Sequence, residues 1–335
     1  MSAPLLEVSK LAVRFDTDEG SVHAVNDVSF TLEQGEALGI VGESGSGKSV
    51  TALSIMGLVP TPPGHIEAGS IRFRERELLG APERELRGIR GREIAMIYQD
   101  PMTSLNPALP VGRQLSEIVR HHLGLDRREA LERASELLAL VGIPNAGGRL
   151  GDHPHQFSGG QRQRILIAMA LSCDPAVLIA DEPTTALDVT VQAQIVELVK
   201  ELRDRLGMAI VWITHDLGVV AGLVDKIAVM YSGYVVEQAP VRELFAQPGH
   251  PYTVGLLRSL PTFGGERRRL TPIPGSPPDL SRRVDACPFA PRCDWVIDRC
   301  REEFPDLADV APDHGAACHR RDEVRDASAL VDATP

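Results

Sequence analysis

The segment 42–49, with the sequence GESGSGKS, carries the clearest chemical signal in the chain. It fits the pattern G-x-x-x-x-G-K-[ST], in which a glycine-rich loop wraps around phosphate groups. Backbone N–H groups in such a loop form an anion-binding concavity, and the helix that follows adds partial positive charge. We therefore predict a nucleoside triphosphate site. Its loop residues are Gly42, Ser44, Gly45, Gly47, Lys48, which would reach the terminal phosphates, and Ser49, whose hydroxyl would bind Mg²⁺.

A strand and a helix must hold this loop in place. The apolar run 38–41 (LGIV) comes directly before it, and the run 50–56 (VTALSIM) comes after it. This context predicts a strand, a tight loop and a helix in that order. A glycine-rich surface turn is the plain alternative, and the flanking runs argue against it.

Two adjacent acids, Asp181 and Glu182, follow the apolar run 177–180 (VLIA), which predicts a buried strand that ends at these carboxylates. A carboxylate such as Asp181 suits Mg²⁺, which it would support through a water molecule. Glu182 is suited to polarise an attacking water, because phosphoryl transfer needs mainly alignment and charge stabilisation. The alternative is a pair of solvent-facing acids at a strand end.

A third motif, FSGGQ at 157–161, comes before an apolar helical run at 165–171. Because the motif opens a helix, it would also offer backbone donors and a helix dipole to phosphate. The residues expected to do so are Ser158, Gly159, Gly160 and Gln161.

With FSGGQ directly before RQR at 162–164, and the acidic pair about twenty residues later, the chain resembles the ATP-binding subunit of an ATP-binding-cassette (ABC) transporter. The resemblance covers residues 5 to about 320, with the motifs in order. It implies ATP as the nucleotide, with Mg²⁺. It also implies that the FSGGQ motif of one chain serves the nucleotide bound by the loop of another, so that each ATP site needs two chains.

Further residues take their roles through this resemblance. His215, after the run 211–214, would be the switch histidine that contacts the γ-phosphate. Gln99, after a strand expected at 94–98, would bind Mg²⁺ and link to a helical subdomain. The loop 185–188, which ends at Asp188, would cross the dimer interface. Phe15 is the candidate for stacking on adenine, with a plain core phenylalanine as the alternative.

The composition is that of an ordinary globular chain, and 335 residues favour two domains. A net charge of −11 argues against a nucleic-acid partner that needs a broad basic face. No apolar run approaches the roughly 20 residues that span a bilayer, and the first residues lack a basic-then-apolar signal segment. We therefore expect a soluble, cytosolic protein whose transport pathway lies in other chains.

The order of the patterns predicts an α/β fold of the P-loop NTPase, ABC-ATPase type. Short β-rich runs over 5–40 and 66–80 indicate an antiparallel sheet, and the pattern from about 100 to 157 is helical. Strands that alternate with helices then indicate a mostly parallel core sheet. From about 246 the chain becomes proline- and arginine-rich. The expected domains are a nucleotide-binding domain over 1–245 and a separate, loop-rich C-terminal extension over 246–335.

Four of the five cysteines lie in the last fifty residues, while Cys173 stands alone in the helix after FSGGQ. In a cytosolic protein this clustering favours a metal site over disulfides, and four thiolates suit Zn²⁺ or an iron–sulfur cluster alike. Unligated cysteines in a small core are the other interpretation. The four are Cys287, Cys293, Cys300 and Cys318, and His314 and His319 lie near them in the sequence.

The segments 250–261, 272–275 and 287–293 resemble the C-terminal extension of oligopeptide and dipeptide importer ATPases. This resemblance implies a [4Fe-4S] cluster on the four cysteines, with zinc as the alternative. It also implies a bacterial peptide importer, in which this chain pairs with a sister ATPase or with a second copy of itself. Two transmembrane permease subunits and an extracytoplasmic peptide-binding protein would complete the assembly, with this chain at the cytoplasmic face of the inner membrane.

Two other functions stay open at this point. The same machine could import nickel or another small solute. A soluble ABC ATPase of ribosome or DNA metabolism is the alternative from another class. Such proteins usually carry two cassettes or a coiled-coil insertion, and this sequence has neither.

Overall fold

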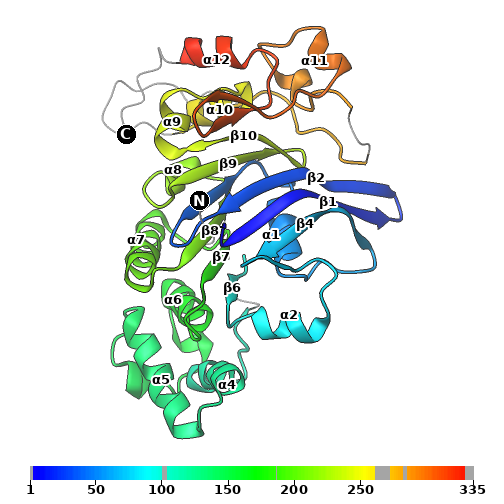
Figure 1. Cartoon of the computed structure of the whole chain (residues 1–335). Coiled ribbons are helices and arrows are strands. Elements are labelled where there is room, and N and C mark those ends of the chain that lie inside the picture. The colour runs from blue at the N-terminus through cyan, green and yellow to red at the C-terminus, as the bar shows by residue number, and fades with distance from the viewer. Residues whose placement is uncertain (1–2, 100–103, 186, 261–271, 282–284, 329–335) are drawn as a thin grey trace. The chain divides into compact units, whose positions relative to one another are not determined.

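The computed structural model of the chain describes residues 3–99, 104–185, 187–260, 272–281 and 285–328 (Figure 1). These residues form two compact units. The first unit contains residues up to 32, 38–79 and those from 214 onward, and the second contains 33–37 and 80–213. No helix in the described ranges is long and apolar enough to cross a membrane.

The first unit contains the antiparallel sheet that the sequence predicts. Its strands are β1 (Leu6–Thr17), β2 (Gly20–Leu32), β4 (Gly64–Phe73) and β5 (Arg76–Glu77), in the order β2-β1-β4-β5. Apolar side chains two positions apart, Leu6 with Val8 and Leu11 with Val13 of β1, are buried, and a register irregularity separates the two pairs.

The phosphate loop follows a strand of a second sheet in the first unit. It follows β3 (Ala37–Val41), which pairs in parallel with β9 (Lys226–Tyr231). Next to β9 come β10 (Tyr234–Pro240), β12 (His314–Ala316) and β11 (Ala308–Ala311), each antiparallel to its neighbour. The boundary near residue 246 stays a prediction, but β11 and β12 show that part of the expected extension continues this sheet.

In the second unit, three parallel strands carry the acidic pair. They are β6 (Ile94–Ile97), β7 (Val177–Asp181) and β8 (Ala209–Thr214). Every residue of β7 and β8 is buried, as expected for strands of a covered parallel sheet. The strand expected at 94–98 ends one residue earlier than predicted, because Tyr98 lies beyond β6 and leaves 44% of its surface exposed.

The helices of the second unit are α2 (Glu83–Ile89), α4 (Val111–Leu123), α5 (Arg127–Leu140), α6 (Gly159–Ala170) and α7 (Val189–Leu206), with 3₁₀ turns η1 (Ala146–Arg149) and η2 (Pro154–Gln156). Helices α4 and α5 pack on each other, and both contact α6, which in turn contacts β6 (Figure 1). The helical pattern predicted from about 100 to 157 is confirmed from residue 111 on. Residues 100–103 lie outside the described ranges.

The remaining helices lie in the first unit. They are α1 (Lys48–Ile55), α8 (Leu217–Val220), α9 (Val241–Ala246), α10 (Pro251–Arg258), the 3₁₀ turn η3 (Ala290–Arg292), α11 (Arg299–Glu302) and α12 (Arg321–Ser328). Rings of Tyr252 on α10, Tyr231 on β9 and Phe289 beside η3 pack against one another at centroid distances of 4.6–5.5 Å. This aromatic cluster fastens the extension to β9.

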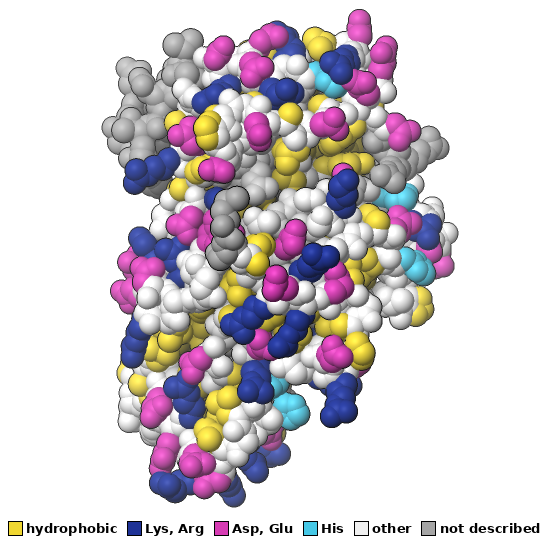
Figure 2. All heavy atoms as spheres, in the orientation of Figure 1, with side chains coloured by type: hydrophobic (Ala, Val, Ile, Leu, Met, Phe, Trp, Pro, Cys, Tyr) yellow, Lys and Arg dark blue, Asp and Glu magenta, His cyan; other side chains and the backbone are white. Residues whose placement is uncertain are grey.

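Charged side chains of both signs are intermingled on the face shown in Figure 2. Exposed ion pairs one helical turn apart also occur in the chain, such as Arg128 with Glu132 at 2.8 Å. Exposed pairs of this kind contribute little to stability. The surface in this view therefore has no field of a single sign.

The buried His250 makes the stability of the first unit depend on pH. Its Nδ1 accepts the N–H of Tyr252 at the start of α10, and burial lowers the pKa of His250 from 6.5 to about 3. Between about pH 3 and pH 6.5 the unfolded chain binds a proton that the folded chain does not. His250 therefore leaves the free energy of unfolding unaffected above pH 6.5 and lowers it as the pH falls below 6.5. The decline is at most about 1.4 kcal/mol per pH unit.

We predict that His250→Asn, which keeps an oxygen acceptor at the helix start but cannot titrate, flattens the loss of thermal stability between pH 7 and pH 5. Differential scanning calorimetry of the full chain measures this, with the exposed His121→Asn as the matched control. An unchanged pH slope in His250→Asn would show that the buried imidazole does not govern it.

Candidate functional site

The path of the phosphate loop is imposed by the backbone of neighbouring strands. A Cβ atom at Gly42 would lie 2.1 Å from the carbonyl oxygen of Met230, and one at Gly47 would lie 2.4 Å from that of Ala24. Gly47 also has a φ of 98°, which residues other than glycine rarely adopt. Both glycines of the motif are therefore required by close approach of backbone to backbone.

The loop presents the features of an anion site. Helix α1 begins after Gly47 with no side-chain cap among the described residues, so its first N–H groups point out of the helix end. Ser44 and Gly45 are exposed, and a Cβ at Gly45 would meet nothing within 4 Å. The open side of the loop and the uncapped helix end together fit phosphate.

Lys48 lies inside the loop. Its side chain is buried, and Nζ donates to the carbonyl oxygens of Gly42 at 2.8 Å and Glu43 at 2.9 Å. A buried ammonium group held this way is a positive charge placed at the centre of the loop. Ser49, in the first turn of α1, is half-buried.

The second unit brings Gln99, Glu182 and Thr185 together. Oε2 of Glu182 accepts a hydrogen bond from Gln99 Nε2 at 3.2 Å and another from Thr185 Oγ1 at 2.9 Å. Glu182 is buried to 9% exposure, and two donors therefore fix the orientation of one of its oxygens.

The backbone at the acidic pair is unusual. Asp181 is the last residue of β7 and is buried, and Glu182 has a φ of +46°, which is uncommon outside glycine. The N–H of Glu182 still donates to the carbonyl of Ile213 on β8 at 2.9 Å. Such local strain is found at functional sites, where the surrounding structure holds it in place.

The FSGGQ motif opens a helix, as predicted. Ser158 is the N-cap of α6, and its hydroxyl accepts the N–H of Gln161 while the Gln161 side chain accepts the N–H of Ser158. This capping box fixes the start of the helix. A Cβ at Gly160 would lie 2.7 Å from a methyl carbon of Val191 on α7, and Ser158 and Gly159 are exposed.

Asp188 caps α7 by accepting the N–H of Val191 at 2.9 Å. Beside it, Val189 leaves 80% of its surface exposed. Ala186, in the loop expected to cross the dimer interface, lies outside the described residues.

The last two predicted nucleotide residues lie in the first unit. His215 follows β8 and is exposed. Phe15 on β1 is half-buried, with its ring edge 3.0 Å from where a Cβ of Gly64 would stand. It is therefore not a fully buried core residue, but stacking on adenine stays a prediction.

All five cysteines are free thiols. Burial raises the pKa of Cys287, that of Cys293 to about 11 and that of Cys318 to about 12, and the charges of the other cysteines of the extension add to each rise. Sγ of Cys293 accepts the N–H of Trp295 at 3.3 Å, and Sγ of Cys318 accepts the N–H of Arg320 at 3.4 Å. Cys318 also packs in a small apolar cluster with Val254 and Val324.

Two histidines near the cysteines in sequence have other contacts. Nε2 of His314 lies 2.7 Å from Oε1 of the buried Glu237, and Nε2 of His319 lies 3.3 Å from the carbonyl oxygen of Glu303. Within the described ranges, no group of three or more His, Cys, Asp or Glu side chains is arranged to hold a metal ion.

Sequence reasoning missed the residues that hold the phosphate loop from outside. Arg292 forms an ion pair with Glu43 of the loop at 2.8 Å, and the Tyr252 hydroxyl accepts the N–H of Glu43 at 2.9 Å. Glu43 stands at a variable position of the motif, and its two partners are more than 200 residues away. No local pattern indicates either contact.

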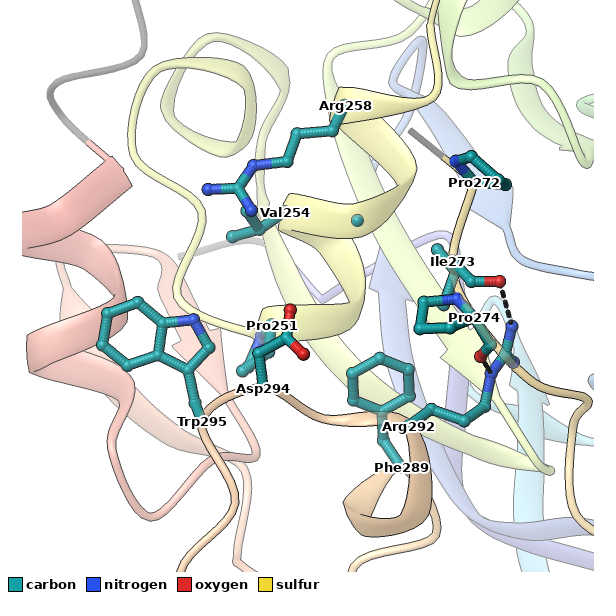
Figure 3. A pocket seen from close by; sticks show the side chains of 11 residues that line it. Pro251, Val254, Arg258, Pro272, Ile273, Pro274, Phe289, Arg292, Asp294 and Trp295 are labelled. Atoms are coloured by element: carbon teal, nitrogen blue, oxygen red, sulfur yellow. Dashed lines mark hydrogen bonds between the residues drawn. The ribbon is translucent and has the colours of Figure 1, made fainter. Parts of the chain in front are cut away.

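A shallow pocket beside Arg292 is lined by residues of the extension. Val254 and Arg258 of α10 face Asp294 and Trp295 across it, with Phe289 and Arg292 along one side (Figure 3). This pocket holds none of the residues predicted to contact nucleotide.

The geometry defines a P-loop nucleotide-binding protein, and comparisons with known proteins identify the class. The family described as "ABC transporter" matches residues 25–185, and the one described as "Oligopeptide/dipeptide transporter, C-terminal region" matches residues 236–300. A dimeric ATP-binding cassette solved in a post-hydrolysis state with ADP and phosphate has a TM-score of 0.63 and 27% identity, over 71% of this chain and 99% of that one.

Two curated relatives match almost end to end. The oligopeptide transport ATP-binding protein OppD of Salmonella typhimurium is 52% identical over 94% of this chain and 93% of its own length. A probable peptide ABC transporter ATP-binding protein of Sinorhizobium fredii is 52% identical over 96% of both chains. The chain therefore belongs to the family of peptide ABC transporter ATP-binding proteins, and it is an ABC-type ATPase.

The loop geometry predicts that Gly42→Ala weakens nucleotide binding at least about tenfold, because the carbonyl of Met230 cannot yield to the new methyl group. Equilibrium titration with a fluorescent ATP analogue measures the affinity. Gly88→Ala in α2, where a Cβ meets nothing within 4 Å, is the control and should bind as the wild type does. Equal affinity of Gly42→Ala and the control would contradict the close-approach argument.

Proposed function

We propose that this chain is the ATP-hydrolysing subunit that powers import of dipeptides or oligopeptides by a bacterial ABC transporter. The observation that carries the proposal is the match of residues 236–300 to the C-terminal region of oligopeptide and dipeptide transporters, in the same chain as the ABC cassette. The near-complete coverage of oligopeptide transport relatives supports it.

In this proposal the loop 42–49 binds the phosphates of ATP. The uncapped start of α1 and the buried Lys48 supply the positive charge, and the exposed Gly45 leaves the backbone donors accessible. Ser49, Gln99 and Asp181 would hold Mg²⁺, which neutralises phosphate charge when bound. His215 would contact the γ-phosphate, and Phe15 would stack on the adenine.

Glu182 is the residue we assign to orienting the attacking water. Gln99 and Thr185 both donate to Oε2, which fixes the orientation of the carboxylate that we propose accepts a proton from the attacking water. The positive φ of Glu182 supports this assignment, since it aims a buried carboxylate from a strand end.

We further propose that two ATPase chains act together, as a heterodimer with a sister subunit or as a homodimer. The exposed Ser158 and Gly159 at the start of α6, and the exposed Val189 beside Asp188, suit a surface that contacts nucleotide and a second chain. Two transmembrane permeases would receive the motion through the helical region α4–α5, and an extracytoplasmic binding protein would deliver the peptide. In this proposal the chain works at the cytoplasmic face of the inner membrane.

Glu182→Gln is predicted to abolish turnover and to preserve ATP binding, because the amide keeps the shape of the side chain but cannot orient and deprotonate water. ATPase assays of the assembled transporter and nucleotide titration measure the two effects. Glu197→Gln, an exposed position on α7, is the matched control. If Glu182→Gln turns over ATP within twofold of the control, Glu182 does not orient the attacking water.

Lys48→Ala is predicted to weaken ATP binding itself, since it removes the charge-assisted contact at the centre of the loop. The measurement is the equilibrium constant for ATP. An unchanged constant would mean that the loop does not bind the phosphates.

For the extension we propose a structural [4Fe-4S] cluster on Cys287, Cys293, Cys300 and Cys318, with zinc as the alternative. The four cysteines are free thiols, and two of them, Cys293 and Cys318, accept backbone N–H groups at sulfur. Four such thiols in one small region support a shared soft-metal site. Binding would require the thiols to lose their protons and to draw closer than the described arrangement has them. The metal would hold together the segments of the extension that carry the four cysteines, where the apolar cluster is small.

Iron and zinc analysis of anaerobically purified protein tests this proposal. We expect iron and sulfide in cluster stoichiometry, lost when any of the four cysteines is replaced by serine and kept in Cys173→Ser. Stoichiometric zinc without iron would replace the cluster by its alternative, and the absence of both metals would end the proposal.

A further inference from the structure

We propose that Arg292 is a positioning residue for the phosphate loop: it acts through Glu43, so that the C-terminal extension sets the affinity of the loop for nucleotide. The proposal rests on the proposed ATP-binding role of the loop. Arg292 belongs to η3, between Cys287 and Cys293, and Glu43 is the second residue of the loop.

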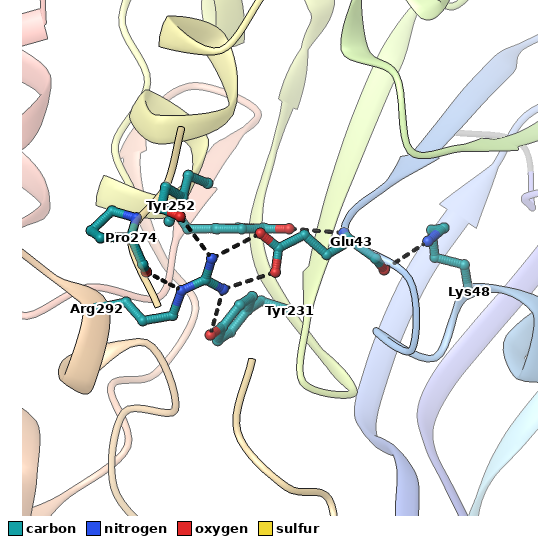
Figure 4. Close-up of polar contacts among 7 residues, drawn as sticks. Glu43, Lys48, Tyr231, Tyr252, Pro274 and Arg292 are labelled. Carbon is teal, nitrogen blue, oxygen red and sulfur yellow. Dashed lines mark hydrogen bonds and ion pairs between the residues drawn. The ribbon is translucent and has the colours of Figure 1, made fainter. Parts of the chain in front are cut away.

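The contact between the two side chains is bidentate. Nη1 of Arg292 donates to Oε2 of Glu43 at 2.8 Å, and Nη2 donates to Oε1 at 3.0 Å (Figure 4). The Arg292 side chain is only 5% exposed and that of Glu43 is 26% exposed. Two parallel charge-assisted hydrogen bonds fix both distance and orientation, unlike a surface ion pair.

Contacts outside the phosphate loop also hold the Arg292 side chain in place. Its Nε donates to the carbonyl oxygen of Pro274 at 2.8 Å, and Nη1 also donates to the hydroxyl oxygen of Tyr231 at 3.2 Å. Figure 3 shows the guanidinium against the chain at Ile273 and Pro274. The extension therefore presents the guanidinium in a fixed position to the carboxylate of the loop.

Glu43 connects Arg292 to the lysine of the loop, because its backbone also contacts Lys48. The N–H of Glu43 donates to the Tyr252 hydroxyl at 2.9 Å, and its carbonyl oxygen accepts Lys48 Nζ at 2.9 Å (Figure 4). The side chain, the N–H and the carbonyl of one residue thus join Arg292, Tyr252 and Lys48. A shift of Glu43 would displace an acceptor that places the Lys48 ammonium.

A purely structural role for the ion pair makes a different prediction. If Arg292 only fastened the extension to the first unit, its loss would lower stability but would leave the affinity of the folded protein for ATP unchanged. The polar contacts continue from the guanidinium to Lys48, which favours the positioning role. Nucleotide affinity of folded variants therefore separates the two roles.

The test is equilibrium titration of the full chain with ATP, for Arg292→Gln, Glu43→Gln and the double variant. We expect each single variant to raise the dissociation constant about tenfold, and the double variant to raise it no further, because both changes break one contact. Arg292→Lys, which keeps the charge but not the two-pronged geometry, should lie between wild type and Arg292→Gln. Arg128→Gln, which breaks an exposed Arg–Glu pair of the same 2.8 Å length, is the control.

Steady-state kinetics of the assembled transporter provide the second readout. In Arg292→Gln we expect KM for ATP to rise and kcat to stay within about twofold, since Arg292 touches no reacting group. Should the Arg292 variants not fold, Tyr252→Phe and Glu43→Gln complete the test, because each loosens the loop and leaves Arg292 in place.

Unchanged ATP affinity in folded Arg292→Gln or Glu43→Gln would overturn the proposal, as would a double variant whose effect is the product of the two single effects. Either result, with normal binding by the wild type and weak binding by Lys48→Ala, would leave the proposed function standing. A wild type that does not bind ATP would overturn both.

Discussion

Two backbone carbonyl groups, those of Met230 and Ala24, leave no space for a side chain at Gly42 and Gly47. The third constraint is a hydrogen bond from the N–H of Gly233 to the carbonyl of Ser46 at 3.1 Å. The phosphate loop is thus held between β2 and the β9–β10 turn by contacts within the protein. Contacts that keep a binding loop in one conformation reduce the entropy that is lost on binding.

Residues of the C-terminal extension contact the phosphate loop at Glu43. The rings of Tyr231 and Phe289 lie beside the Arg292 guanidinium and help to bury it, which strengthens its interaction with the Glu43 carboxylate. The same surroundings raise the pKa of Tyr231 and Tyr252 by burial, so both hydroxyls stay protonated at neutral pH. The charge pair and its neutral hydroxyl partners therefore form one network, in which no member can be removed without leaving another unsatisfied.

Signals that lie within a few residues of each other predicted much of this structure. The strand–loop–helix around 42–49 and the helix start at Ser158 were both predicted, because glycine spacing and the apolar runs beside these motifs are local signals. The Glu43–Arg292 pair could not be predicted, because 249 residues separate its members and only tertiary packing brings them together. The same holds for His314, which pairs with Glu237 although its sequence neighbours are cysteines.

A transport measurement tests most directly whether this ABC-type ATPase powers the import of peptides. The chain would be reconstituted in proteoliposomes with the proposed partners, namely an ATPase subunit, two permeases and a peptide-binding protein. Uptake of a radiolabelled oligopeptide would then be followed with ATP or ADP on the ATPase side. We expect the peptide to accumulate against its gradient with ATP and not with ADP. ATP hydrolysis without peptide accumulation, together with ATP-driven uptake of nickel or another small solute, would contradict this expectation.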